Sequence, residues 1–338
     1  MTEINKNIEN DIENDIENDI ENDIENDIEN DIENDIEINK EENLNNTENN
    51  TENNTENNTE NNEEKDTNYI KNIYELPDHL KDEYITQYVI GRNNRECISN
   101  LFKLHSESVN AWTMIISNLS VLLITIYIFM RHNFSRLYSF IFILHLLAYT
   151  IHTPFSVGYH AFSSIDKDEY IKWRKYDVYG IFLRNIILTF TLSFFTYSDF
   201  KYVLINTSVT IAIVYYSLLK FKENEDNHQP LDKIEQGKLI GYTVLSLIYP
   251  VLYKIYLLYK QKKFNILYYL SIIIVLITII GGSLYCFRIP DIFFKPGTFN
   301  NIGSSHNLMH FCVIIVSICE VLYIYISAKE GNYIKSFK

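Results

Sequence analysis

The chain has 338 residues and a formal net charge of −15, but its charges are divided very unevenly. Residues 1–66 hold 25 acidic and 3 basic side chains, whereas the rest of the chain carries 19 acidic and 26 basic ones, a net charge of +7. The acidic composition therefore describes a tail and not the folded part. The four cysteines form no C-x-x-C pair, which argues against a disulfide framework and against a thiolate metal site.

The tail consists of two short repeats. Ile-Glu-Asn-Asp recurs every four residues from Ile8 to about Glu37, and Thr-Glu-Asn-Asn recurs from Thr47 to about Asn62. One isoleucine in four residues cannot build a core against so much like charge, and Asn and Asp are weak helix formers. We therefore expect residues 1–66 to be a disordered low-complexity segment, in preference to a calcium-binding or partner-binding one.

Seven apolar stretches follow the tail and a juxtamembrane segment of residues 67–112. Each is close to the roughly 20 residues that a helix needs to cross the apolar core of a bilayer. Lipid obliges each segment to satisfy its own backbone hydrogen bonds, so helices are expected despite the many β-branched residues. The predicted spans are 113–131, 138–162, 178–198, 201–219, 238–259, 264–287 and 306–327.

This pattern predicts an all-α membrane protein with a seven-transmembrane helix bundle over residues 113–327 and a short tail over residues 328–338. The first apolar run begins after residue 110, so we expect no amino-terminal signal peptide and insertion by an internal helix. About 15 Lys and Arg residues flank the spans on one side and about 9 on the other. This bias favours a cytosolic amino terminus and an extracellular or lumenal carboxyl terminus.

Four ionisable residues coincide near the cytosolic leaflet in this layout. His160 ends the second span, Asp177 begins the third, and His306 and His310 begin the seventh. The last two are four residues apart on one helix, so both imidazoles reach a single metal ion. Three imidazoles with an open fourth position are typical of catalytic zinc, and Asp177 would then orient a water molecule or accept its proton.

Histidines that only hydrogen-bond between helices remain the alternative to this metal site. Ser156 lies one turn before His160, and His152 and His145 continue a polar stripe along that helix. We interpret the stripe as interhelical hydrogen bonding in preference to a proton relay. Glu320 and Arg184 also lie inside spans and would pair with other polar groups that face the bundle interior.

Several segments of the chain resemble the progestin and adipoQ receptor family, which includes adiponectin receptors and hemolysin III-related proteins. The resemblance covers about residues 76–327. It is carried by Leu76-Pro77, residues 99–113, Ser156-Val-Gly-Tyr-His160, Asp177-Val-Tyr-Gly-Ile181 and residues 285–310.

Three positions depart from the family's usual pattern. Met114 stands where the family usually has His, Ser106 where it usually has Asn, and Asp291 where it usually has Glu. All three lie outside the presumed metal ligands.

The resemblance implies an adiponectin-receptor-like bundle with a cytosolic amino terminus. It also implies zinc (Zn²⁺) bound by His160, His306 and His310, with Ser156 and Asp177 as catalytic residues close by. Animal members of the family are similar to hydrolases of the ceramide amide, and others are described as steroid receptors, regulators of lipid or zinc balance, or membrane-lytic proteins.

Three functions therefore stay open for this chain: a zinc-dependent, ceramidase-like amide hydrolase, a receptor or regulator in which zinc only joins helices, and a membrane-lytic protein. The partners that we expect are the bilayer and a membrane lipid, ceramide-like or other. We expect no nucleic acid.

Overall fold

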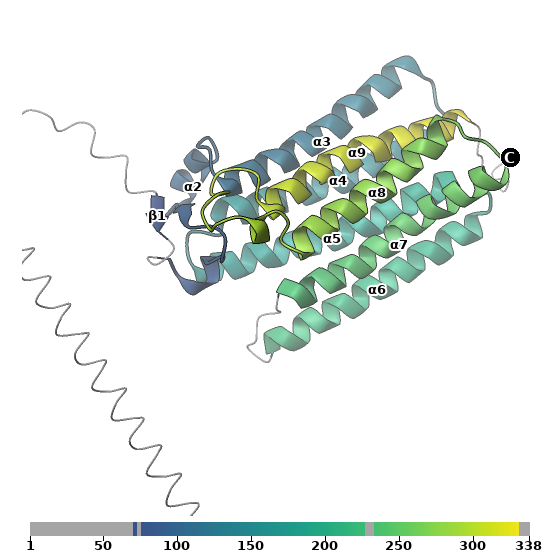
Figure 1. Ribbon diagram of the computed structural model, residues 1–338. Helices are drawn as coiled ribbons and strands as arrows, with labels where there is room; N and C mark the ends of the chain where they lie inside the picture. The colour runs from purple at the N-terminus through teal and green to yellow at the C-terminus, as the bar shows by residue number, and fades with distance from the viewer. Residues whose placement is uncertain (1–69, 73–75, 227–232, 331–338) are drawn as a thin grey trace, which may run out of the picture. The chain divides into compact units, whose positions relative to one another are not determined.

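The computed structural model describes residues 70–72, 76–226 and 233–330 of the chain. The predicted tail of residues 1–66 lies outside the described residues, as do residues 331–338. Seven helices are long and apolar enough to cross a membrane, which confirms the predicted fold class (Figure 1). They are α3 (Ser106–Arg131), α4 (Arg136–Phe162), α5 (Lys167–Thr196), α6 (Phe200–Asp226), α7 (Lys233–Lys260), α8 (Ile266–Cys286) and α9 (Ser305–Lys329).

The third membrane helix begins eleven residues earlier than its apolar stretch predicts. Asp166 caps α5 by accepting a hydrogen bond of 2.8 Å from the Glu169 amide, and a 2.6 Å ion pair joins Glu169 to Lys172 on the first turns. The polar turns therefore extend the helix beyond its membrane-crossing part. As a result, Asp177 lies about three turns into α5, although it still stands directly before the apolar stretch of that helix.

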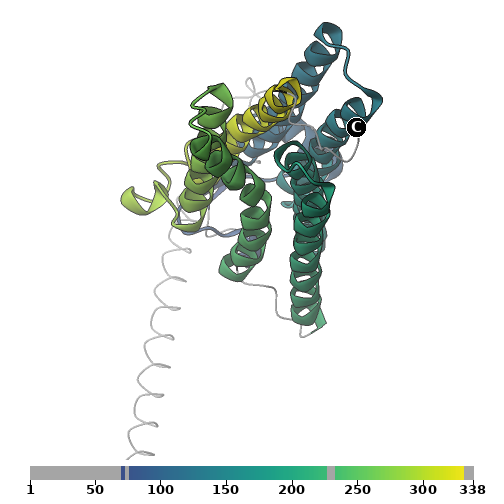
Figure 2. The same ribbon diagram turned by 90° about the vertical axis from the view of Figure 1, so that its right-hand side faces the viewer.

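Burial distinguishes central helices from peripheral ones. In the most apolar stretch of α5, 61% of the residues are buried, whereas the corresponding stretch of α6 is only 28% buried. The helix α9 contacts α3 and α8 as neighbours and also touches α4 and α5, so it is an inner helix too. Figure 2 shows the yellow α9 between the green α8 and the blue amino-terminal helices. The helices α5 and α9 are thus among the most buried in the bundle.

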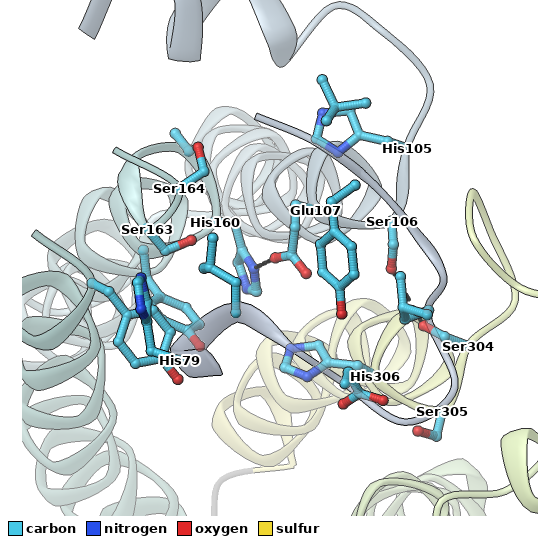
Figure 3. A pocket seen from close by; sticks show the side chains of 18 of the residues that line it. His79, His105, Ser106, Glu107, His160, Ser163, Ser164, Ser304, Ser305 and His306 are labelled. Carbon is cyan, nitrogen blue, oxygen red and sulfur yellow. Dashed lines mark hydrogen bonds and ion pairs between the residues drawn. The ribbon is translucent and has the colours of Figure 1, made fainter. Parts of the chain in front are cut away.

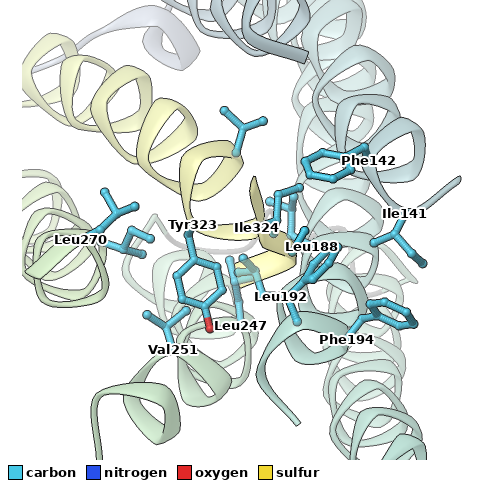
Figure 4. Packing of buried hydrophobic residues seen from close by; sticks show 14 of the residues in the cluster. Ile141, Phe142, Leu188, Leu192, Phe194, Leu247, Val251, Leu270, Tyr323 and Ile324 are labelled. Atoms are coloured by element: carbon cyan, nitrogen blue, oxygen red, sulfur yellow. The ribbon is translucent and has the colours of Figure 1, made fainter. Parts of the chain in front are cut away.

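The largest cluster of buried apolar side chains fills the half of the bundle that lies away from the beginning of α9. Phe142 and Leu188 pack there with Tyr323 and Ile324 (Figure 4). On the outer faces of the bundle, large apolar side chains such as Leu123 and Met130 are exposed, as expected for surfaces that face lipid. The other half of the bundle interior contains buried polar side chains such as His152, Ser156 and His310.

A small cap covers that polar end. It contains a two-stranded antiparallel sheet, a 3₁₀ turn and a short helix, and it rests on the loop between α8 and α9. Arg288 in that loop forms an ion pair of 2.6 Å with Asp82, and Asn300 Oδ1 accepts a hydrogen bond of 2.8 Å from the Thr86 amide. The cap elements are β1 (Ile70–Asn72), η3 (Asp78–Leu80), β2 (Gln87–Val89) and α2 (Asn94–Asn100), and the loop holds η4 (Asp291–Phe293).

The close approach of α4 and α5 gives a test of this packing. A Cβ atom added at Gly158 would lie 2.1 Å from Cζ3 of Trp173, so Gly158→Ala is expected to destabilise the bundle by about 1–3 kcal/mol. At Gly282 in α8, a Cβ atom meets nothing within 4 Å, so Gly282→Ala is expected to be neutral or to stabilise by up to ~1 kcal/mol. Thermal unfolding of the two variants in detergent checks the contrast, which equal melting temperatures would contradict.

Candidate metal centre

Three histidine side chains meet at the polar end of the bundle. The helix α4 runs toward the cap and carries His160 in its last turn, whereas α9 starts beneath the cap and carries His306 and His310 in its first two turns. Because the two helices run in opposite directions, residues 150 positions apart reach the same depth. One ring nitrogen from each histidine lies within 4.8 Å of the other two.

The geometry of these nitrogens suits a metal ion. A tetrahedral zinc ion with bonds of about 2.0–2.1 Å places its nitrogen ligands roughly 3.3–3.4 Å apart. The Nε2 atoms of His306 and His310 are 3.1 Å apart. Within the described residues, the buried Nδ1 of His310 has no hydrogen-bond partner. The contact of the other ring nitrogen, Nε2, is to His306 on the same helix.

Glu107 in the first turn of α3 orients one of the three imidazoles. Its Oε2 lies 2.6 Å from Nδ1 of His160, so the ring donates its Nδ1 proton to the carboxylate and turns Nε2 toward the other two histidines. The sequence analysis did not assign a role to Glu107. A carboxylate in the first turn of an apolar helix, at the same end of the bundle as the histidines, was the available signal.

The two predicted catalytic residues lie beside the histidines, in a cavity of about 310 Å³ that His306 and His310 also line. Asp177 Oδ1 lies 3.1 Å from Nε2 of His152, and Ser156 is buried one turn further along α4. His152 therefore makes an interhelical hydrogen bond, in line with our interpretation of the polar stripe. Its contact fixes the orientation of the Asp177 carboxylate.

A second cavity of about 690 Å³ lies on the cap side of the centre. Figure 3 shows His160, Glu107 and His306 directed toward its interior, with the dashed contact between His160 and Glu107. His306 and Tyr285 line both cavities, so the centre lies between them. The smaller cavity is bounded mainly by membrane helices, and the larger one by helix ends and the cap.

Two of the positions that depart from the family pattern hold the start of α9, Ser106 from α3 and Asp291 from η4 in the preceding loop. The carbonyl of Ser106 accepts a hydrogen bond of 3.1 Å from the Asn307 amide group, which also donates to Asn110 at 2.7 Å. Asp291 accepts from both the backbone and the hydroxyl of Ser305, at 3.0 and 2.5 Å. The shortened side chain at position 291 thus still anchors the turn before His306.

At the cap end of the bundle, burial favours the uncharged form of two titratable groups. Burial lowers the pKa of His105, and Nδ1 of this neutral ring accepts from the Ser108 amide at 3.4 Å, which caps α3. Burial likewise raises the pKa of the Cys97 thiol.

Arg184 and Glu320 come together through Tyr149. The Tyr149 hydroxyl donates a hydrogen bond to the Glu320 carboxylate, and the Arg184 guanidinium carbon lies 4.8 Å from the centre of the Tyr149 ring. Glu320 thus pairs with a polar group of the bundle interior, as the sequence analysis expected, whereas Arg184 lies against the aromatic ring of the same residue. They line the same 310 Å³ cavity as the histidines.

A seven-helix membrane bundle with three convergent histidines at one end defines the class of protein. The sequence profile described as haemolysin-III related matches residues 102–321, which include every candidate site residue. The chain therefore belongs to the haemolysin III-related family of progestin and adipoQ receptors. This confirms the resemblance that the sequence motifs indicated.

Relatives come from fungi, plants and animals. The chain is 24% identical over 289 residues to the ADIPOR-like receptor IZH1 of Eremothecium gossypii, covering 78% of this chain and 86% of the relative. It is 23% identical to Heptahelical transmembrane protein 1 of Arabidopsis thaliana, over 71% and 76% of the two chains. With Progestin and adipoQ receptor family member 3 of Homo sapiens it shares 25% identity, over 72% and 80%.

Proposed function

We propose that this protein is a zinc-dependent hydrolase that cleaves the amide bond of a ceramide-like lipid within the membrane. The observation that carries the proposal is the set of three imidazole nitrogens within 4.8 Å of one another, next to a cavity lined by Asp177 and Ser156. A zinc ion held by three imidazoles supplies Lewis acidity, which polarises a carbonyl group and activates water near neutral pH.

Each protein group has a distinct role in this proposal. His160, His306 and His310 hold the ion, and Glu107 keeps the His160 ring in the tautomer that presents Nε2. Asp177, held in place by His152, takes the proton of the attacking water and delivers it to the leaving amine. Ser156 donates a hydrogen bond that positions the lipid carbonyl. The lipid chain occupies the apolar part of the 310 Å³ cavity.

Orientation belongs to the same proposal. The cap and the histidines lie at the end of the bundle where α3 begins, which is the side that carries more Lys and Arg residues. With the amino terminus in the cytosol, the larger cavity admits water from the cytosolic side.

The test uses full-length protein purified in detergent. Elemental analysis is expected to find about one zinc ion per chain, and ceramide is expected to release fatty acid. A chelator should abolish the release and added zinc should restore it. Bound zinc without any fatty-acid release under these conditions would contradict the hydrolase. That result would favour a receptor in which zinc joins α4 to α9, consistent with the names of two relatives, which describe them as receptors.

Glu107 offers a milder perturbation of the centre. The change Glu107→Gln keeps the volume but replaces the charged acceptor of the His160 proton, so zinc affinity is expected to fall about 10–100-fold. Titration with a fluorescent zinc chelator measures the change. Glu83→Gln, at an exposed carboxylate in the cap, is the matched control and should leave the affinity unchanged. Equal affinities for the two variants would remove Glu107 from the centre.

A further inference from the structure

The 310 Å³ cavity has a second polar end that the proposed hydrolysis does not use. Arg184 on α5 and Glu320 on α9 line it, at depths where membrane helices seldom place charge. Glu320 is only 1% exposed, and its carboxylate accepts the Tyr149 hydroxyl, while the Arg184 guanidinium lies over the Tyr149 ring. These three side chains, which we call the deep cluster, form a polar patch in an otherwise apolar part of the cavity.

The deep cluster retains hydrogen-bonding capacity. Nε of Arg184 is buried and has no acceptor among the residues that the structure describes. Only Oε2 of Glu320 takes part in the hydrogen bond with Tyr149. A guanidinium offers five donors and a carboxylate only acceptors, so the pair presents both kinds of group side by side.

The charges of the deep cluster define which group fits it. Glu320 would repel an anion and Arg184 would repel a cation. A hydroxyl group, in contrast, accepts a hydrogen bond from the guanidinium and donates one to the carboxylate. Both contacts are charge-assisted, and Glu320 is almost fully buried. A neutral hydroxyl is therefore the best match for this end of the cavity.

Helix geometry gives the spacing between the two polar ends. Arg184 follows Asp177 by seven residues on α5, which corresponds to about 10 Å along the axis, and Glu320 follows His310 by ten residues on α9, about 15 Å. The walls between are mainly apolar, with Ile181, Ile240, Ile277, Val313 and Val316 among the lining side chains and Thr278 as a polar exception. A ligand that fills the cavity thus has a polar head, an apolar stretch and a second polar group.

We propose that the deep cluster recognises a hydroxyl group far along the acyl chain of the bound lipid, so that the protein selects amides of chain-hydroxylated fatty acids. This inference rests on the proposed function, which places the acyl carbonyl of the lipid at the histidines. The hydroxyl is then held about 10–15 Å away by Arg184 and Glu320. Selection arises from hydrogen bonds that an unsubstituted chain cannot make.

Equilibrium binding of radiolabelled fatty acids to the full-length protein in detergent tests the proposal without requiring hydrolysis. The probes are octadecanoic acid and its derivatives with a hydroxyl group at carbon twelve or at carbon two. The carbon-twelve derivative is expected to bind about tenfold more tightly than the unsubstituted acid, the effect of one hydrogen bond to a charged group. The carbon-two derivative, whose hydroxyl group lies next to the carboxylate, should show no gain.

Variants connect the preference to the deep cluster. The combined change Arg184→Met, Tyr149→Phe and Glu320→Leu leaves neither an unpaired charge nor an unpaired hydroxyl, and should reduce the tenfold ratio to about one while octadecanoic acid still binds. Tyr323→Phe is the control. Tyr323 lies on α9, the helix of Glu320, and its buried hydroxyl lies 2.5 Å from the hydroxyl of Thr196, outside the cavity, so this variant should keep the ratio.

A ratio near one in the wild-type protein would overturn the inference, as would a tenfold ratio in the triple variant. Either result is independent of whether ceramide is cleaved, because the free acids are not substrates for hydrolysis. Conversely, a protein that prefers the hydroxylated acid but releases no fatty acid from ceramide would sustain this inference and contradict the enzyme.

Discussion

Replacing His306 by alanine is expected to leave the purified protein without bound zinc and to reduce fatty-acid release from ceramide to background. With one of three ligands gone, two imidazoles hold the ion, and affinity falls by more than the roughly 10–100-fold that changes outside the ligand set produce. Because Nε2 of His306 and Nε2 of His310 lie 3.1 Å apart, the substitution also removes one of two closely spaced nitrogen ligands.

The control for His306→Ala comes from the opposite end of the bundle. His132 follows α3 there, and its Nε2 lies 2.7 Å from the hydroxyl of Tyr325 on α9. His132→Ala removes an imidazole and a contact to the same helix, yet should keep the zinc content and the hydrolytic rate. Zinc is measured by elemental analysis after gel filtration. Equal zinc content in His306→Ala and wild-type protein would show that these histidines do not form the metal site.

The seven spans could be predicted from sequence because hydrophobic length alone defines a membrane-crossing helix. Their ends were predicted less well, as the start of α5 at Lys167 shows. Capping by Asp166 and a pair of oppositely charged side chains extend that helix through polar sequence, which a search for apolar stretches does not detect. The cap was not predicted at all, because strands of three residues leave no readable period.

The proximity of the histidines could be expected from the sequence. Successive membrane helices run in opposite directions, so the end of α4 and the start of α9 lie at the same side of the bilayer. Partners such as Glu107 and His152 could not be assigned in the same way. Which face of a helix points inward depends on its rotation, and the rotation follows from packing against several neighbours together. The same reason kept the deep cluster hidden, since Arg184 and Glu320 meet only through Tyr149 on a third helix.

The sharpest test of the proposed chemistry removes the proton acceptor and leaves the metal ligands unchanged. Asp177→Asn keeps the volume of the side chain and an oxygen that can accept from Nε2 of His152, so the variant should fold and should bind zinc as the wild-type protein does. The amide has no basic oxygen, so the water is no longer deprotonated, and the rate of ceramide hydrolysis is expected to fall about 10²–10⁴-fold.

Two measurements decide between the roles that Asp177 could have. Zinc content unchanged with a rate reduced at saturating ceramide supports a general base, because the defect then lies in the chemical step and not in binding. Loss of zinc together with activity would instead make Asp177 a ligand of the ion. Asp199→Asn, at an exposed carboxylate in the turn between α5 and α6, should change neither quantity. A full rate in Asp177→Asn would leave the water without its proposed proton acceptor, and hydrolysis by this arrangement would have to be abandoned.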